Sequence, residues 1–574
     1  MWLLWVAVAS AAVTRTVSDG DVLATVCLAV ESGDTIEIDP ARSVELSVDK
    51  CDLYGKDNVI VTSSTSGVAE VGGITVVGGS GVVLENLRLF VHPDFTDESI
   101  FLNQASDVVL TNIYLAQATT GGVYAFDAAG LQVQGLHHEE AGGLDDHILT
   151  IGTQPAAAAM SISVTDVTGS GPGAKISVVG PAQLEVTLQD LDLTGGEGSL
   201  GGCVQLTAAK TLSVGPEITL YNAQLHECSA DTGGALYMDK GVLDIQGGSI
   251  TSSQAATGGG AYFGPFTTVT ADGLTLRANV APQGAALAVD GGHFTGSDLW
   301  VQENVSSPDG SGGAVLGLAP SALDLSNSQL CGNLVKGFGT DVGSALTLRG
   351  GKASLDHVEL RGHSGGTALL FLDSSAAFAD LGHLSVWDNS QDLLIAAQSG
   401  AGFTLRASLM AHAEMGYVFP GGSPGTGFNY WYQVSSPNAV GSVHGSDLTS
   451  GADPLLTGNP VGTDCSIPLN LDAGSPLIDQ AGSGTDPDGT VADIGAHAFD
   501  QVPDTGDTGE TGETGETGPE TGDSGPQDSD PQDSALPPTP LRLLGGCGRD
   551  TRRGTGAAVL LLGLAMLGAG RRQG

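Results

Sequence analysis

The chain has 574 residues, enough for a large core or for a long array of repeats. Acidic residues outnumber basic ones by 65 to 20, and a surface with a net charge of −45 repels nucleic acid. Glycine accounts for 87 residues without a strict three-residue period, which excludes collagen and favours short strands joined by tight turns.

The first segment, 1–12, is predicted to be a secretory signal peptide. It begins MWLLWVAVASAAV, an apolar run followed by Ala9, Ser10 and Ala11, and small residues of this kind are typical of a signal-peptide cleavage site. The run has no Lys or Arg at its start, so a buried N-terminal strand is the alternative. An exported chain can form disulfides.

A phrase of aliphatic residues around Asn occurs twice. Residues 82–89 read VVLENLRL and residues 108–115 read VVLTNIYL, 26 residues later. A looser copy, LQVQGL, starts at 131. Asn tolerates left-handed turns, and stacked Asn amides can hydrogen-bond to one another. We therefore expect Asn86 and Asn112 to lie on neighbouring turns of a repeat.

A second unit, Gly-Gly-Ala or a variant followed by aliphatics, recurs further along. Aligned on the third residue, or on the fourth in GGGAYF, its copies are separated by 32, 26, 25, 28, 31 and 23 residues. Upstream asparagines accompany several copies and are expected to form one stacked series: Asn222, Asn279, Asn304, Asn333 and Asn389.

A period of 23–32 residues indicates a solenoid. The stretches between glycine clusters are short and alternate with period 2, which predicts strands rather than helices. Three strands and their turns fill one repeat, so the sequence predicts an all-β fold, a parallel β-helix over 13–445. A β-sandwich array is the alternative.

Three stretches resemble known families. ESGDTIEIDP (31–40) with NVIVTSS at 58 resembles the first coil of secreted right-handed β-helix proteins of the pectin-lyase type. The Asn and Gly-Gly-Ala units over about 200–390 resemble polymorphic outer membrane protein repeats. The stretch from Asp453 through LNLDAGSPLID to DPDGTVADIGAHAFD resembles the closing segment of choice-of-anchor Q proteins, here 446–500. These resemblances imply a right-handed helix on an exported, bacterial surface protein, and they imply no single activity.

The last 74 residues differ in composition from the rest. Residues 501–541 include DTGDTGETGETGETGPETGDSG and are predicted to be an extended acidic spacer, with a short collagen helix as the alternative. Residues 542–574 contain Cys547, an apolar run and Arg571-Arg572, which resembles a MYXO-CTERM sorting tail and implies processing or lipidation at Cys547. A plain membrane anchor is the alternative.

Two cysteine pairs have a spacing close to the repeat interval. Cys27 and Cys51 are 24 residues apart, and Cys203 and Cys228 are 25 apart, so stacked coils would bring each pair within bonding range.

The densest cluster of polar residues is HHEEAGGLDDH, at 137–147. Asp145 and Asp146 could act as general acid and base in glycoside hydrolysis, or could join His147 in binding a metal. The companion motifs of β-helix hydrolases and lyases are missing, and an exposed loop is the alternative.

Two further candidate sites lie near the end of the predicted β-helix. Asp486, Asp488 and Asp493 surround a glycine turn and are candidate Ca²⁺ ligands, a solvated turn being the alternative. In FNYWYQ, the rings of Phe428, Tyr430 and Tyr432 could face outward and stack on sugars, with Trp431 inward. An aromatic stack beneath the closing segment is the alternative.

The sequence therefore predicts an exported protein tethered to the bacterial surface or outer membrane by its C-terminal tail. Its expected role is non-catalytic: adhesion, glycan binding or envelope structure, with a polysaccharide or an envelope component as partner. No cofactor is required, apart from the candidate Ca²⁺. A polysaccharide hydrolase or lyase on the same fold is the alternative. The absence of a run of ten-residue alternating strands at the C-terminus disfavours an autotransporter passenger.

Overall fold

The structure is a computed structural model that describes residues 12–17, 21–40, 50–64, 67–90, 98–116, 121–139, 147–154, 159–208, 214–307, 310, 312–336, 341–391, 393–419, 424–438, 443–449, 451–457 and 465–499. All of them belong to one compact unit, Met1–Asp504. The predicted spacer and anchor, and residues 1–11 of the predicted signal peptide, lie outside the described residues. Within the described ranges, no helix is both long and apolar enough to cross a membrane.

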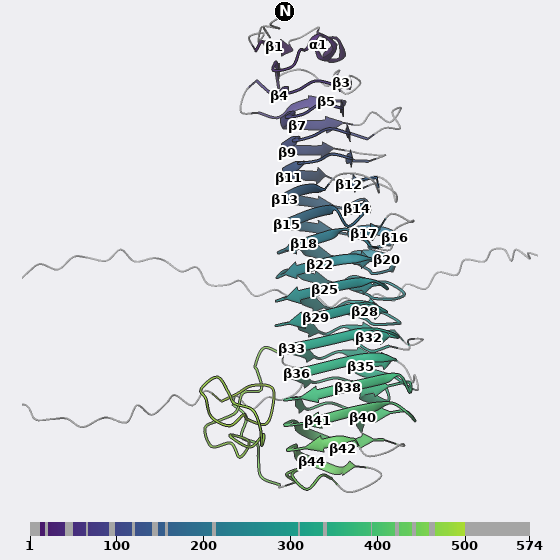
Figure 1. The fold of residues 1–574 in the computed structure, drawn as a ribbon, viewed down its shortest axis with the longest axis vertical. Coiled ribbons are helices and arrows are strands. Elements are labelled where there is room, and N and C mark those ends of the chain that lie inside the picture. The colour runs from purple at the N-terminus through teal and green to yellow at the C-terminus, as the bar shows by residue number, and fades with distance from the viewer. Residues whose placement is uncertain are drawn as a thin grey trace, which may run out of the picture. The chain divides into compact units, whose positions relative to one another are not determined.

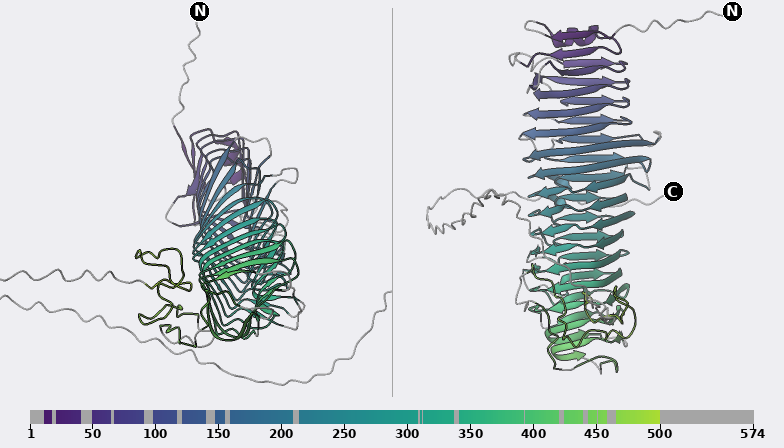
Figure 2. Two further views of the ribbon diagram at one scale, coloured as in Figure 1. Left: turned by 60° about the horizontal axis from the view of Figure 1, so that its bottom comes forward. Right: turned by 90° about the vertical axis from the view of Figure 1, so that its left-hand side faces the viewer.

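The chain winds into an all-β parallel solenoid, as the repeats predict (Figure 1). Each turn passes through three faces, named here in the order in which the chain visits them. Strands on successive turns pair in parallel and in register, and they form one sheet of 39 strands. Figure 2 shows the resulting stack from two further directions.

Face 1 consists of the following strands, several of which continue into face 2: β1 (Thr14–Val17), β2 (Thr35–Ile38), β4 (Ile60–Ser63), β7 (Val83–Phe90), β9 (Val109–Ala116), β11 (Gln132–Glu139), β13 (Met160–Ser170), β15 (Leu184–Thr194), β18 (Glu217–Tyr221), β22 (Gly241–Gln246), β25 (Thr267–Asp272), β29 (His293–Ser297), β33 (Ala322–Cys331), β36 (Gly351–Arg361), β38 (Ala377–Gly382), β41 (Gly402–Arg406) and β43 (Gly425–Gly427). Face 2 adds β5 (Ala69–Val71), β19 (Gln224–His226), β23 (Ser249–Thr251), β26 (Thr275–Arg277), β30 (Trp300–Gln302), β39 (Ser385–Trp387), β42 (Leu409–Val418) and β44 (Tyr430–Asn438).

Face 3 consists of β3 (Lys50–Tyr54), β6 (Gly73–Val77), β8 (Ile100–Asn103), β10 (Val123–Phe126), β12 (Leu149–Gly152), β14 (Ile176–Gly180), β17 (Val204–Ala208), β21 (Leu236–Met238), β24 (Ala261–Phe263), β28 (Leu287–Asp290), β32 (Val315–Leu318), β35 (Gly343–Arg349), β37 (Ala368–Leu372) and β40 (Leu393–Ala397). Two small sheets lie between faces 2 and 3: β16 (Glu197–Leu200) with β20 (Ser229–Thr232), and β27 (Val280–Ala281) with β31 (Val305–Ser306) and β34 (Leu334–Val335). The helix α1 (Leu23–Ala29) contacts β3 near the N-terminal end.

The motif that occurs at 82–89 and again at 108–115 forms the bend between faces 1 and 2. β7 and β9 pair in register, and Asn112 Nδ2 donates a hydrogen bond to Asn86 Oδ1 at 3.1 Å. Both residues have positive φ, 56° and 51°. Such a conformation is tolerated by Asn and is the reason that Asn recurs at this position. The prediction that these residues occupy neighbouring turns is confirmed.

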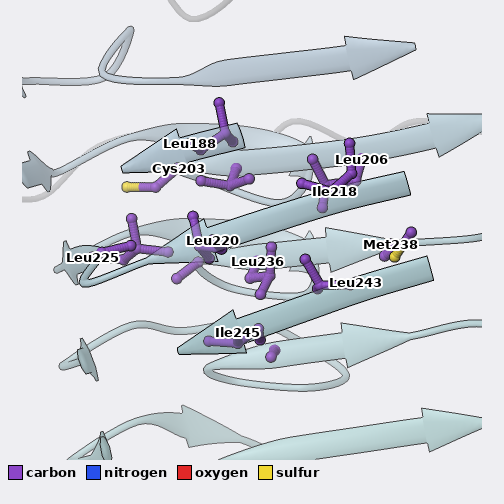
Figure 3. Close-up of a cluster of buried hydrophobic side chains, with 14 of the residues drawn as sticks. Leu188, Cys203, Leu206, Ile218, Leu220, Leu225, Leu236, Met238, Leu243 and Ile245 are labelled. Carbon is purple, nitrogen blue, oxygen red and sulfur yellow. The ribbon is translucent and has the colours of Figure 1, made fainter. Parts of the chain in front are cut away.

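Aliphatic side chains fill the interior in columns. Leu188, Leu220 and Ile245 follow one another on successive turns of face 1, while Leu206 and Met238 do so on face 3 (Figure 3). Each fully buried aliphatic side chain contributes roughly 1.5–3 kcal/mol through burial. The backbone pairing places equivalent positions of successive turns above one another. Aliphatic residues that recur at the repeat interval are therefore sufficient to form a continuous core.

A second column of asparagines is buried between faces 2 and 3. Asn304 Oδ1 accepts hydrogen bonds from Asn279 N and Nδ2, at 2.9 and 3.1 Å, and Asn333 Oδ1 accepts from Asn304 N and Nδ2, both at 2.9 Å. Asn389 Oδ1 likewise accepts from the backbone of His363 on the preceding turn, at 2.8 Å. The expected stacking of asparagines is confirmed for Asn279, Asn304 and Asn333, whereas His363 separates Asn389 from them.

Two details of the sequence alignment are corrected by the register. Asn222 does not belong to the buried column: it is exposed at the bend between faces 1 and 2, where its Nδ2 donates to Asp190 Oδ1 at 2.9 Å. Ala261 of GGGAYF pairs with Leu236 and not with Ala235, so this copy aligns on its third residue, as GGCVQL and GGALYM do. An alignment based on spacing alone allows an error of one residue. The backbone pairing does not, because it fixes which residues lie opposite one another on successive turns.

Candidate functional site

A cavity of about 680 Å³ lies where the bend between faces 1 and 2 meets the closing segment, 446–500. Both the last turns of the solenoid and the closing segment contribute to its lining, with Asp356, Asp380, His383, Arg406, Phe428 and Ser483 among the residues. The closing segment runs beside these turns in Figures 1 and 2. The cavity therefore depends on the docking of a segment that does not share the repeat.

The bend places two histidines next to each other. His357 and His383 occupy the same bend position as Asn86 and Asn112, with φ of 56° and 49°. The residues before and after them pair in register across β36, β38 and β39, so the two imidazoles project from successive turns. Their rings stack with centroids 4.4 Å apart and planes at 15°.

One carboxylate joins the two rings. His383 Nδ1 donates to Asp356 Oδ1 at 2.9 Å, and His357 Nδ1 lies 3.2 Å from the other oxygen, Oδ2. These two hydrogen bonds hold the pKa of the Asp356 carboxyl well below its usual range. One possible ligand atom from each of the three residues lies within 4.8 Å of the other two, and among the described residues no other group of His, Cys, Asp or Glu does so.

A second ionic group lies on the adjacent turns. Arg406 is 3.6 Å from Asp380, and the Thr404 hydroxyl donates to the same carboxylate. Both partners of the ion pair are largely solvent-exposed, so the pair contributes little to stability. It supplies a cation and hydrogen-bonding groups to the cavity wall.

The closing segment docks on face 2 through buried polar contacts. Glu359 is buried, and its carboxylate accepts from Gln329 Nε2 at 2.9 Å and from the backbone of Leu469 at 3.0 Å. Arg361 is fully buried, with its Nε 3.4 Å from Glu359. The Ser385 hydroxyl accepts from Ala496 N at 2.8 Å. The disulfide Cys331–Cys465, 134 residues apart, links the two parts covalently. The spacing of this third pair is unrelated to the repeat, so the sequence did not predict the bond.

The candidate Ca²⁺ ligands form a compact turn within this segment. Asp493 accepts backbone hydrogen bonds from Asp479 and Phe499, and Asp486 accepts one from Asp493 N at 3.1 Å. Burial, and then the nearby charge of Asp493, raise the pKa of Asp486 to about 6. Asp486 and Asp493 are buried, whereas Pro487 and Gly489 of the turn between them are exposed. Ca²⁺ binding here stays a prediction.

The predicted catalytic cluster is described only in part. Asp145 and Asp146 lie outside the described residues. His147 lines a second cavity, of about 280 Å³, together with Glu98, Tyr124 and Thr150. The proposed pairing of the two aspartates therefore stays a prediction.

Tyr430 and Tyr432 form the aromatic stack beneath the closing segment that was the alternative for this stretch, and sugar stacking stays a prediction. Tyr430 is 1 % exposed, packs against the closing segment, and donates its hydroxyl to Ala452 O at 2.6 Å. Tyr432 stacks on Trp387 at 5.9 Å, and only Phe428 is exposed. Trp431 points inward as predicted. A strand that another segment covers buries side chains on both of its faces, so alternation alone did not predict exposure here.

The cysteine pairs form as their spacing predicts. Cys27 is bonded to Cys51, which ties α1 to the first strand of face 3, and Cys203 is bonded to Cys228. Cys547 lies outside the described residues, so its processing stays a prediction.

A strip of outward-facing residues on face 3 is the other candidate site. It contains two pairs of half-buried aromatic rings with three polar residues between them. In order along the solenoid the strip consists of Phe101, Tyr124, Thr150, Ser177, Gln205, Tyr237 and Tyr262, each in register with the next.

The rings of each aromatic pair are parallel. Phe101 and Tyr124 stack at 5.6 Å and 5°, and Tyr237 and Tyr262 stack at 5.4 Å and 4°. One face of Tyr124 and one face of Tyr237 are thus directed toward the polar residues between the pairs. The aromatic residues of GGVYAF, GGALYM and GGGAYF were a signal for this strip, but the misaligned GGGAYF copy concealed it.

No family model matches this chain, and no curated protein matches it.

Proposed function

We propose that this chain is an exported, surface-anchored, right-handed parallel β-helix protein that binds polysaccharide along face 3 without cleaving it. Export is supported by the apolar N-terminal run and by three disulfides, which persist in oxidising compartments. Anchoring is supported by the acidic spacer and the apolar tail that ends in an arginine pair. Right-handedness is supported by the strong preference of parallel crossover connections for that hand.

The face-3 strip is the observation that carries the binding proposal. Tyr124 and Tyr237 are four turns apart, about 19 Å at the usual spacing of roughly 4.8 Å per strand. Thr150 and Gln205 are half-buried and offer hydrogen-bonding groups between the two ring faces, whereas Ser177 between them is buried. Aromatic faces bounding polar groups suit a short run of sugar residues, whose C–H faces are apolar and whose hydroxyls are polar.

The charge of the chain narrows the ligand class. At −45, the protein repels polyanions, so a neutral polysaccharide is expected in preference to a uronate polymer. Because the strip belongs to consecutive turns of a rigid sheet, it requires little ordering when a linear ligand binds.

The test is retention of the protein on a panel of neutral and acidic polysaccharides. Replacing Tyr124 or Tyr237 with Ala is expected to weaken retention about tenfold, which corresponds to ~1.4 kcal/mol for a lost stacking contact. Trp300→Ala is the matched control, because Trp300 is an exposed aromatic residue of face 2. Equal retention of all three variants would exclude the strip as the binding site.

The enzymatic alternative is tested on the same panel. Release of new reducing ends that disappears in the Asp145→Asn/Asp146→Asn double variant would identify a polysaccharide-cleaving enzyme and overturn the non-catalytic proposal.

A further inference from the structure

We propose that Asp356, His357 and His383 bind a divalent transition-metal ion at the bend between faces 1 and 2. The site is separate from the face-3 strip, and the proposal does not depend on polysaccharide binding. Three observations support it: the donor geometry, the way in which the fold places the donors, and the open cavity beside them.

The donor atoms already have nearly the separations that a metal site requires. The two carboxylate oxygens of Asp356 lie 2.9 Å from His383 Nδ1 and 3.2 Å from His357 Nδ1. Ligand atoms about 2.0–2.2 Å from a tetrahedral ion are separated by roughly 3.3–3.5 Å. The carboxylate oxygens therefore need to move only a few tenths of an ångström from the nitrogens, while the two imidazoles turn out of their parallel stack so that both Nδ1 lone pairs point to one ion. Each imidazole presents its Nδ1 lone pair once its proton moves to Nε2, and the carboxylate is already ionised.

The backbone holds these donors in place without the ion. The two histidines occupy equivalent positions on paired turns, at left-handed φ, so their side chains leave the backbone next to each other. Gly382 leaves the space that the carboxylate fills, since a Cβ at that position would lie 2.7 Å from Asp356 Oδ1. Asp356 and His357 on one turn and His383 on the next are thus close together, and Gly382 leaves room for the carboxylate between them.

The donor types indicate the class of metal. Two imidazole nitrogens and one carboxylate suit Zn²⁺ and other first-row ions, whereas Ca²⁺ prefers oxygen ligands alone. Asp356 and His383 also line the cavity of about 680 Å³. Three protein ligands leave a coordination position for water or for a ligand from the cavity, which is the arrangement of open zinc sites.

The test is a titration of the full-length protein with ZnCl₂ after treatment with a chelator, followed by calorimetry. The expected result is one equivalent of Zn²⁺ that is lost, or bound at least about tenfold more weakly, in His357→Gln and in His383→Gln. His293→Gln is the matched control: His293 lies 2.9 Å from Asp324, but this pair supplies only two donor residues. The control is expected to bind like the wild type.

A second measurement covers the case in which a variant is misfolded. Co²⁺ added to the wild-type protein is expected to give the intense visible absorption of low-symmetry nitrogen and oxygen coordination, and excess Ca²⁺ should not displace it. Absence of that absorption, or an unchanged Zn²⁺ stoichiometry in a folded His357→Gln/His383→Gln double variant, would overturn the proposal.

Discussion

At the scale of single residues, asparagine has two different roles in this solenoid. At the exposed bend, Asn86, Asn112 and Asn222 are favoured for their backbone conformation, with φ between 46° and 56°. Inside the turn, Asn304 is favoured for its side chain, because its amide makes hydrogen bonds to both neighbouring turns. The same residue type thus satisfies two unrelated physical requirements.

These two roles predict different effects of substitution. Asn304→Ala is expected to destabilise the solenoid by about 1–3 kcal/mol, because it leaves the buried backbone N–H of Asn279 and C=O of Leu276 without partners. Amide hydrogen exchange is the appropriate measurement, since faster exchange should be confined to the adjoining turns of the array. Asn222→Gly, which retains the left-handed bend, is the control and should leave exchange nearly unchanged. A similar effect of both substitutions would contradict the distinction.

Asp486 is expected to make docking of the closing segment dependent on pH. Its folded pKa of about 6 lies above the ordinary value of 3.8, so the folded protein binds this proton more tightly than the unfolded chain. The contribution is therefore fully present below about pH 4 and is lost as the pH rises through 6, by on the order of 1–3 kcal/mol. We expect the difference in stability between wild type and Asp486→Asn, measured by urea titration, to shift in favour of the variant between pH 4 and pH 7.

Added Ca²⁺ distinguishes the two interpretations of this turn. If Asp486, Asp488 and Asp493 bind the ion, Ca²⁺ at pH 7 should raise the urea midpoint of the wild type and leave that of Asp486→Asn unchanged. An equal change of the two urea midpoints on addition of Ca²⁺ would exclude the site.

At the scale of elements, the closing segment is held by contacts that the repeat does not supply. Leu469, Leu477 and Ile494 pack against Trp387 and Tyr430 of face 2. Glu359 and Arg361 are both buried, and removal of either would leave the other charge buried without its ionic partner. The segment and the last turns of the solenoid therefore depend on each other.

Removing the Cys331–Cys465 disulfide is expected to loosen this segment. The bond closes a loop of 134 residues, for which chain entropy predicts a stabilisation of about 4–5 kcal/mol. In the Cys331→Ser/Cys465→Ser variant we expect limited proteolysis to produce new cuts within 465–499, identified by mass spectrometry.

The matched control for this prediction is Cys203→Ser/Cys228→Ser. That disulfide lies within the solenoid and spans 25 residues, so its loss should not change cleavage of the closing segment. Equal cleavage of the two double variants would mean that the disulfide of the closing segment has no particular role in docking.

At the scale of the whole molecule, the repeated turns form long continuous faces although each turn contacts only its neighbours. Each turn packs only on its neighbours, so a residue type repeated at the turn interval becomes a column on one face. The face-3 strip and the bend histidines are both consequences of this architecture. The strip recurs over several turns and suits a repeating polymer, whereas the Asp–His trio is confined to two turns and suits a single ion.

The sequence by itself determined the parallel solenoid, the neighbouring positions of Asn86 and Asn112, and the two disulfides whose spacing matches one turn. These features depend on contacts between adjacent turns. Such contacts require similar residue types at the repeat interval, so they can be recognised in the sequence. Only the tertiary structure decided the burial of Tyr430, the bond between Cys331 and Cys465, and the cavity beside His383, because an irregular segment docks on the solenoid far from its place in the chain. It also decided the register that brings Tyr237 and Tyr262 together, since a slip of one residue in the alignment turns every side chain to the opposite face of the sheet.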